Sequence, residues 1–261
     1  MGLLSKDIQF HIKTNSEQIG KYVIMPGDPG RVPLIAERLE NAVQVANNRE
    51  YNTYTGYLGG VKVSVCSTGI GGPSAAIAVE ELIRCGAHTF IRVGTSGGMD
   101  LKVVGGDLVV AQAAIRGDGA SQEYLPPHYP AVADFTVTKA LAEEAALLCK
   151  NADGKRFHVG VVQSKDSFYG EVEPETMPVA DYLEKRWESF LKCGCLASEM
   201  EAATIFAVAL TRNVRAGAVL TAIWNVERSK AGLPDFHTES SEKAITCAVN
   251  AVKRLIKADN K

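Results

Sequence analysis

Two arginines stand where a bound anion would explain their position. Arg31 follows the turn Gly27–Gly30 and starts a predicted helix, and Arg92 lies within the apolar run TFIRV, just before the turn GTSGG. A cation at a helix N-terminus is unfavourable by itself, and a charge in a buried strand is costly unless it is paired or liganded. A structural salt bridge is the alternative for Arg92. Because ligands bind at the carboxyl ends of strands in α/β folds, we predict an anion site at these two turns.

A pair of carboxylates offers a second kind of chemistry. Glu199 and Glu201 flank Met200 directly before an apolar helical run at residues 202–210. Negative side chains at a helix N-terminus fit the helix dipole, which would make their role structural. Two carboxylates at this spacing would also suit paired hydrogen bonds to vicinal hydroxyls. The residues alone leave both interpretations open.

The stretch Ser67–Leu82, STGIGGPSAAIAVEEL, links a strand to a helix through a glycine-rich turn. Such a turn brings backbone N–H groups close to an anion or a sugar hydroxyl, and an ordinary tight strand-to-helix connection is the simpler alternative. The spacing lacks the G-x-G-x-x-G pattern of dinucleotide sites. Because Arg31 and Arg92 point to the other two turns, we interpret Ser67–Leu82 as the scaffold between them.

Strands alternate with helices along the chain, with no internal repeat and no linker. The predicted strands, the third and fourth of which form a hairpin, are 22–25, 43–46, 54–58, 61–66, 89–93, 107–115, 157–163 and 215–224. The predicted helices are 32–39, one that ends near Gly86, 139–149, 181–192, 202–210 and about 240–256. Residues 165–180 have no clear period and the composition of a functional loop or lid. The expected fold is a single α/β domain over residues 1–261, with a mixed, strongly bent β-sheet flanked by helices.

Composition is that of a globular protein. Of the 261 residues, 46% are hydrophobic and 22% charged, and the net charge of −2 carries no basic signature of nucleic-acid binding. No apolar run is long enough for a membrane span, and the first residues lack signal-peptide architecture. The 6 cysteines show neither metal-ligand spacing nor a disulfide framework. We expect a cytoplasmic protein without nucleic-acid or membrane partners.

Taken together, the motifs resemble the nucleoside phosphorylase family, in the class of purine nucleoside and uridine phosphorylases. Besides Ser67–Leu82, they are GDPGR (27–31), NREY (48–51), RVGTSGG (92–98), DSFY (166–169) and EMEAA (199–203). Their order and spacing match essentially the whole chain, and the likeness is greatest to bacterial-type uridine phosphorylases. The resemblance implies a partly barrel-like sheet and reversible phosphorolysis of a nucleoside to a free base and ribose 1-phosphate.

The resemblance also implies a set of site residues. Catalysis would rest on Arg31, Arg92 and Glu201. Phosphate, the co-substrate, would be bound by Gly27, Arg31, Arg92, Gly94, Thr95 and, from a neighbouring subunit, Arg49. Ribose would be bound by Thr95, Glu199, Met200, Glu201 and, again from the neighbour, His11. Such sharing implies a homo-oligomer built from dimers, expected to be a hexamer. No cofactor is required, and a structural K⁺ is expected at Glu50, Ile70 and Ser74, which match residues that hold a monovalent cation in some members.

The base site departs from the family pattern. Phe168 would cover the sugar and base, but the Gln-x-Arg pair with which uridine phosphorylases read uracil is absent from the segment GEVEPETMP (170–178). Glu171 could accept from N3–H of uracil, and Arg228 is a candidate donor.

Purine members usually carry an acidic residue after the last strand, where this chain has Asn225, with Asp235 well downstream. We therefore expect uridine as substrate, with deoxyuridine or thymidine also accepted. A purine nucleoside phosphorylase, a nucleosidase of the same fold and a non-catalytic nucleoside-binding protein are the alternatives. Arg31, Arg49 and Arg92 together speak against the nucleosidase, which needs no phosphate site.

Overall fold

The computed structural model describes residues 7–150 and 156–260. The strands of the described chain are β1 (Tyr22–Pro26), β2 (Glu40–Asn48), β3 (Tyr51–Leu58), β4 (Val61–Cys66), β5 (Thr89–Gly98), β6 (Leu108–Gly117), β7 (Ala131–Val132), β8 (Phe157–Lys165), β9 (Ala197–Glu199) and β10 (Arg215–Asn225). The α-helices are α1 (Arg31–Ala36), α2 (Gly72–Arg84), α3 (Phe135–Lys150), α4 (Tyr169–Val172), α5 (Ala180–Lys192), α6 (Ala202–Arg212), α7 (Val226–Lys230) and α8 (Glu242–Asp259), and short 3₁₀ turns cover Ala120–Glu123 and Pro174–Thr176.

All strands join one mixed sheet that closes partly on itself. The sheet runs in the order β10-β6-β8-β9-β5-β1-β4-β3-β2, and an additional parallel pairing of β10 with β5 turns its first part into a ring. Strand β5 pairs parallel with both β1 and β10, and β3 pairs antiparallel with both β2 and β4. The expected α/β fold with a bent, partly barrel-like sheet is confirmed.

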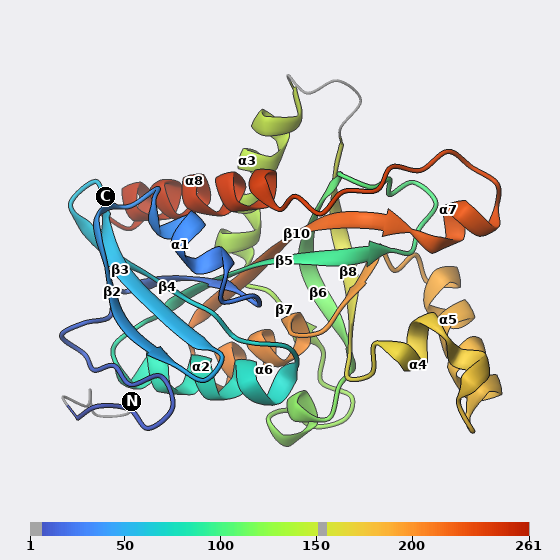
Figure 1. Cartoon of the computed structure of the whole chain (residues 1–261), viewed down its shortest axis with the longest axis horizontal. Coiled ribbons are helices and arrows are strands. Elements are labelled where there is room, and N and C mark those ends of the chain that lie inside the picture. Colours follow the sequence, from blue (N-terminus) through green and yellow to red (C-terminus); the bar gives the residue numbers. More distant parts are fainter. Residues whose placement is uncertain (1–6, 151–155, 261) are drawn as a thin grey trace.

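Helices cover the sheet in two groups with separate cores (Figure 1). Helices α2 and α6 bury Val79, Leu82 and Phe206 in one cluster, and α1, α3 and α8 bury Ile35, Leu141 and their neighbours in the other. Helices α4 and α5 stand outside both groups, beyond the end of β8. In the described part of the chain, no helix combines the length and the apolar character that crossing a bilayer requires.

Several predicted boundaries are confirmed by the backbone. The hairpin between β3 and β4 turns through Gly59 and Gly60 at φ values of 56° and 77°, and Gly86, at φ 98°, ends α2.

Two local predictions were wrong. Strand β5 does not stop at a glycine turn after Val93 but continues to Gly98, paired with β10 along its length. The segment 165–180 is not an irregular loop, since it contains α4 and a 3₁₀ turn.

Candidate active site

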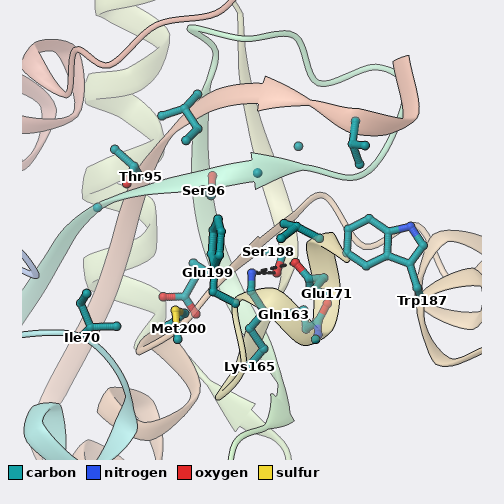
Figure 2. Close-up of a pocket in the computed structure, with 18 of the residues that line it drawn as sticks. Ile70, Thr95, Ser96, Gln163, Lys165, Glu171, Trp187, Ser198, Glu199 and Met200 are labelled. Atoms are coloured by element: carbon teal, nitrogen blue, oxygen red, sulfur yellow. Dashed lines mark hydrogen bonds and ion pairs between the residues drawn. The ribbon is translucent and has the colours of Figure 1, made fainter. Parts of the chain in front are cut away.

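A cavity of about 900 Å³ opens where β1, β5, β8, β9 and β10 reach their carboxyl ends. Its lining contains most of the residues that the sequence predicts for phosphate, ribose and base, namely Gly27, Arg31, Arg92, Gly94, Thr95, Phe168, Glu171, Glu199, Met200 and Glu201. Figure 2 shows Thr95 and Met200 from different elements facing the same space. The structure therefore brings these residues together, and their individual roles stay predictions.

Arg92 is the centre of a buried ion network. Its Nε donates to Glu199 Oε2 at 2.7 Å, and its Nη2 forms an ion pair with Glu201. Burial alone lowers the pKa of the guanidinium, but the charges of Glu201 and Glu199 outweigh it, so that the Arg92 pKa is raised. Arg92 is thus held positively charged. The alternative of a structural salt bridge is correct for two of its nitrogens, Nε and Nη2.

The third nitrogen of Arg92 has a different environment. Nη1 is buried and has no hydrogen-bond partner among the described residues. Buried donors are normally paired, so an unpaired guanidinium nitrogen indicates a ligand that supplies the acceptor. A Cβ placed on Gly27 would lie 3.9 Å from this nitrogen. Arg92 therefore satisfies the salt bridge and still presents a free donor to the cavity beside Gly27.

Glu199 and Glu201 have distinct surroundings despite their spacing. Glu199 accepts from Ser164 Oγ, from Arg92 and from the backbone N–H groups of Glu201 and Ala202, so both of its oxygens are engaged within the protein. Glu199 thereby caps the start of α6 and orients Arg92. The ribose role predicted for it stays a prediction that this geometry does not favour.

Glu201 accepts from the backbone N–H of Gly71 and pairs with Arg92. The pKa of Glu201 is raised, chiefly because the side chain is buried. Attraction to Arg92 opposes this rise in the pKa, and repulsion from Glu199 adds to it. The bond to Gly71 assigns a structural part to the stretch Ser67–Leu82. Its glycine turn fixes the position of Glu201, as expected of a scaffold.

A second polar cluster lies in the cavity, and the sequence did not predict most of it. Lys165 Nζ donates to Ser198 Oγ at 2.7 Å and pairs with Glu171 Oε1 at 2.7 Å, and Gln163 lies beside them (Figure 2). Gln163 and Lys165 both come from the end of β8, and Ser198 is the register partner of Gln163 on β9. Of these residues, the sequence predicts only Glu171 as part of the site. The available signal was a Gln-x-Lys pair at the end of an apolar strand.

Alternation along β8 and β9 separates the two clusters. Successive side chains of a strand point to opposite faces, so Gln163 and Lys165 share one face while Ser164 points to the other. Ser164 accordingly contacts Glu199, within the Arg92 network. Strands β8 and β9 thus contribute Ser164 and Glu199 to the ion network from one face, and Gln163, Lys165 and Ser198 to the Lys165 cluster from the other.

Two residues considered for the base lie outside the lining. Arg228 donates to the carbonyl oxygens of Pro234 and Leu101, so the base role predicted for it finds no support in the geometry. Asn225 is fully buried, donates to the carbonyls of Asp100 and Val103 at 2.8 Å, and caps α7.

The two residues expected to act in a neighbouring subunit lie away from the cavity of their own chain. His11 approaches Glu81 Oε1 through Nδ1 at 2.6 Å, and Glu81 also accepts from the backbone of His11 and Ile12. Arg49 is exposed and has φ of 54°, in the left-handed region that favours glycine. Neither residue lines the cavity of its own chain, and their roles in a neighbouring site stay predictions.

The residues expected to hold K⁺ meet around Gly69. A Cβ on Gly69 would lie 2.8 Å from Glu50 Cγ and 3.4 Å from Ser74 Oγ, and Ser74 Oγ donates to the Ile70 carbonyl at 3.3 Å. Oxygen donors suit a hard cation, but one chain supplies fewer than such an ion usually takes. The set fits a cation only if further oxygens come from a second copy.

Comparison with known proteins gives a consistent result over the whole chain. Residues 21–257 match the model of the phosphorylase superfamily. A uridine phosphorylase of Treponema pallidum is 51% identical over 98% of this chain and 97% of its own length. A uridine phosphorylase of Escherichia coli is 38% identical over 97% of this chain and 100% of its own. A guanosine phosphorylase of Halorubrum lacusprofundi is also 38% identical, over 95% of this chain and 99% of its own.

Proposed function

The chain belongs to the phosphorylase superfamily, and from that membership and its cavity we propose that it is a uridine phosphorylase. It would cleave uridine, and deoxyuridine or thymidine, reversibly with phosphate to give the free base and the pentose 1-phosphate. The observation that carries the proposal is the buried Nη1 of Arg92, which has no hydrogen-bond partner among the described residues, in a side chain that lines the cavity together with Arg31 and Thr95. A nucleosidase has no use for such an anion site.

In the proposed reaction, phosphate and nucleoside would lie next to each other in the cavity. A phosphate oxygen forms a bond to C1′ of the ribose while the C1′–N bond breaks, and the electron pair of that bond leaves with the base, which then takes a proton from water. Arg92, Arg31 and the backbone at Gly94 would hold the phosphate. Glu201 would bind ribose hydroxyls and stabilise the positive charge that develops on the sugar. No side chain has to act as a nucleophile.

Preference for a pyrimidine rests on what lies after β10. Asn225 occupies the place of the acidic residue expected in purine enzymes, and its amide is fully committed to the backbone. Asp235 accepts from the backbone of Gly105 and Asn225 and does not line the cavity. Neither residue is available to protonate a purine ring. Guanosine is the second candidate substrate, because a guanosine phosphorylase is among the similar proteins.

The surroundings of the enzyme are further parts of the proposal. The 6 cysteines are all free. Burial raises the pKa of Cys66, Cys195 and Cys247 to about 12, and reduced, unreactive thiols suit the cytoplasm. The assembly would be a hexamer built from three dimers, in which Arg49 and His11 of one chain complete the site of its neighbour. A K⁺ shared by Glu50, Ile70 and Ser74 of two copies would be structural, with no part in the reaction.

Base release from uridine, thymidine, inosine and guanosine, with and without phosphate, tests the proposal. We expect rapid release from uridine that depends on phosphate and yields a pentose 1-phosphate. Release without phosphate would contradict a phosphorylase. Cleavage of guanosine or inosine in preference to uridine would leave the phosphorylase in place and overturn the pyrimidine assignment.

A further inference from the structure

Two buried acceptors in the Lys165 cluster lack partners. Gln163 Oε1 and Glu171 Oε2 are both buried, and neither has a hydrogen-bond partner among the described residues. Gln163 is only 1% exposed, and Gln163 and Glu171 both line the cavity. Buried polar groups are nearly always satisfied in folded proteins. Unpaired atoms at a cavity wall therefore indicate a ligand that supplies the missing hydrogen bonds.

Lys165 contributes a donor to the same place. An ammonium group carries three N–H donors, and the contacts with Ser198 Oγ and Glu171 Oε1 occupy two of them. The nitrogen also lies 5.8 Å from the ring centre of Phe168, the residue expected to cover the base. The third N–H donor of the buried Lys165 ammonium is thus left for a ligand, close to the ring of Phe168.

The cluster complements an imide. Uracil and thymine present a carbonyl, an N–H and a second carbonyl along one edge, which requires a donor, an acceptor and a donor from the protein. Lys165 is a donor, and Glu171 Oε2 is an acceptor. The Gln163 amide offers a donor once its oxygen and nitrogen are exchanged, because these two orientations are assigned only from hydrogen bonding. Lys165 and Glu171 balance in charge, so a neutral base enters without leaving a charge uncompensated.

We propose that Gln163, Lys165 and Glu171 read the base of the substrate, in place of the absent Gln-x-Arg pair. Glu171 accepts from N3–H, and Lys165 and Gln163 donate to the carbonyl oxygens on either side. The Lys165 ammonium also stabilises the negative charge that spreads onto those oxygens as the base departs. This assignment deepens the proposed function and rests on it. The chain thus carries a Gln-x-Lys pair at the end of β8, before the DSFY motif, whereas the Gln-x-Arg pair of the family pattern follows that motif.

The first test uses the unaltered enzyme with uridine and 3-methyluridine, in which the N3 donor is blocked. Phosphate-dependent cleavage of uridine establishes the activity independently of how the base is read. We expect 3-methyluridine to be cleaved with a kcat/KM at least about 10²-fold lower, because a site built to bond an N–H rejects an analogue without it. Equal kcat/KM values for the two nucleosides would overturn the proposed base site while leaving the phosphorylase intact.

The second test measures the binding of uracil and of ribose 1-phosphate to variants by calorimetry. Lys165→Met and Gln163→Leu are each expected to weaken uracil binding roughly 10- to 100-fold, the scale of one hydrogen bond to a charged or buried group. Ribose 1-phosphate binding should remain at the wild-type value. Lys62→Met, which removes a lysine from β4 outside the cavity, is the matched control. Loss of both ligands together, or of neither, would overturn the assignment.

Lys165→Met leaves the Glu171 carboxylate without its ion pair, which can prevent folding. The double variant Lys165→Met/Glu171→Gln removes that charge and restores neutrality. The same selective loss of uracil binding is expected from it. Guanosine serves as the competitor: with the amide as it stands, Gln163 and Glu171 would together accept from the N–H and amino groups of guanine. Tighter binding of guanine than of uracil would overturn the assignment to an imide.

Discussion

At the scale of single residues, the guanidinium of Arg92 is fitted closely on several sides. Glu199 and Glu201 hold two of its nitrogens, and Gly27 and Gly94 approach it without side chains. A Cβ on Gly94 would lie 2.9 Å from Arg92 Nη2 and 2.9 Å from Leu220 Cδ2. Both neighbours are buried and Arg92 is held by two ion pairs, so a side chain at position 94 would displace the guanidinium or Leu220.

Gly94→Ala should therefore weaken phosphate binding through Arg92. We expect the KM for phosphate to rise by about 10-fold or more, because displacement of the guanidinium costs roughly one charged hydrogen bond. Steady-state kinetics at saturating uridine provide the measurement. Gly119→Ala, outside the cavity, is the matched comparison for phosphate affinity, since the nearest atom to a Cβ there is Asp166 Oδ2 at an ordinary 3.6 Å. Equal phosphate KM values in the two variants would contradict the argument.

The sequence indicates Arg31 and Arg92 as site residues, because a positive charge is unfavourable at each of these positions. That cost can be recognised from the neighbouring residues alone. The sequence did not predict Gln163 and Lys165 as site residues, because their role depends on residues far from them in the chain. Lys165 was assigned to a loop, and only the pairing of β8 with β9 brings it to Ser198, while α4 carries Glu171 to it. Arg228 is a candidate donor on the sequence alone. In the structure it fastens its own loop to the carbonyls of Pro234 and Leu101.

At the scale of elements, most strands and helices followed from hydrophobic periodicity and glycine positions. The predicted end of β5 was too early, because GTSGG has the composition of a turn. In the structure the strand continues, and its glycines make room for the side chains of Arg92 and Asn225. The short strand β9 has too few residues for a period to be seen. Closure of the ring through β10 and β5 is a long-range pairing that no window of sequence contains.

Asp107 joins the beginnings of β6 and β8. It accepts from the backbone of Val104 and Arg156 at 3.0 Å each and from His158 Nε2 at 3.0 Å. Burial alone would raise the pKa of Asp107, but the bonds from His158 and the two backbone groups outweigh it, so that the pKa lies below its usual value of 3.8. A depressed carboxyl pKa stabilises the fold above the unfolded value and loses that effect as the pH falls through the folded value.

Asp107→Asn should accordingly reduce the free energy of unfolding near neutral pH by about 1–3 kcal/mol, the cost of impaired buried hydrogen bonds. The variant should also lose less stability than the wild type as the pH falls below 3.8. Urea unfolding at a series of pH values measures both effects. Asp181→Asn, at an exposed position of α5, is the control and should follow the wild type. A pH dependence as steep in Asp107→Asn as in the control would refute this role.

At the scale of the whole molecule, the cavity of a single chain lacks two of its expected residues. Arg49 stands on the turn between β2 and β3, and His11 is anchored to α2 through Glu81. Large apolar side chains are exposed in the same region, with Phe10 at 68% and Ile70 at 80%. Exposed apolar residues of this size are typical of surfaces that pack against another protein. These features favour sites completed by a second copy.

Subunit mixing tests that arrangement. Arg92→Ala and Arg49→Ala homo-oligomers are each expected to lose about 10²-fold or more in kcat, the scale for removing one transition-state donor. When both variants are produced together, some sites combine an intact Arg92 from one chain with an intact Arg49 from the other. We therefore expect activity to return in the mixed oligomer, as measured after purification through two different tags.

A mixture of Arg92→Ala with Arg31→Ala is the control, since both of these residues line the cavity of their own chain. Every site in that mixture then contains at least one altered arginine, and no activity should return. Full activity of a monomer, or equal recovery in both mixtures, would contradict shared sites.

The alternation of side chains along β8 and β9 also bears on how such enzymes diversify. Ser164 and Glu199 serve the Arg92 network, while Gln163, Lys165 and Ser198 form the other cluster. With the proposed base site, substitutions on one face of these strands are expected to alter which nucleobase is accepted while leaving the Arg92 network unchanged. A lineage could pass from one substrate to another through a few exchanges at every second position. The same division offers an engineer a set of positions to randomise with the catalytic core held constant.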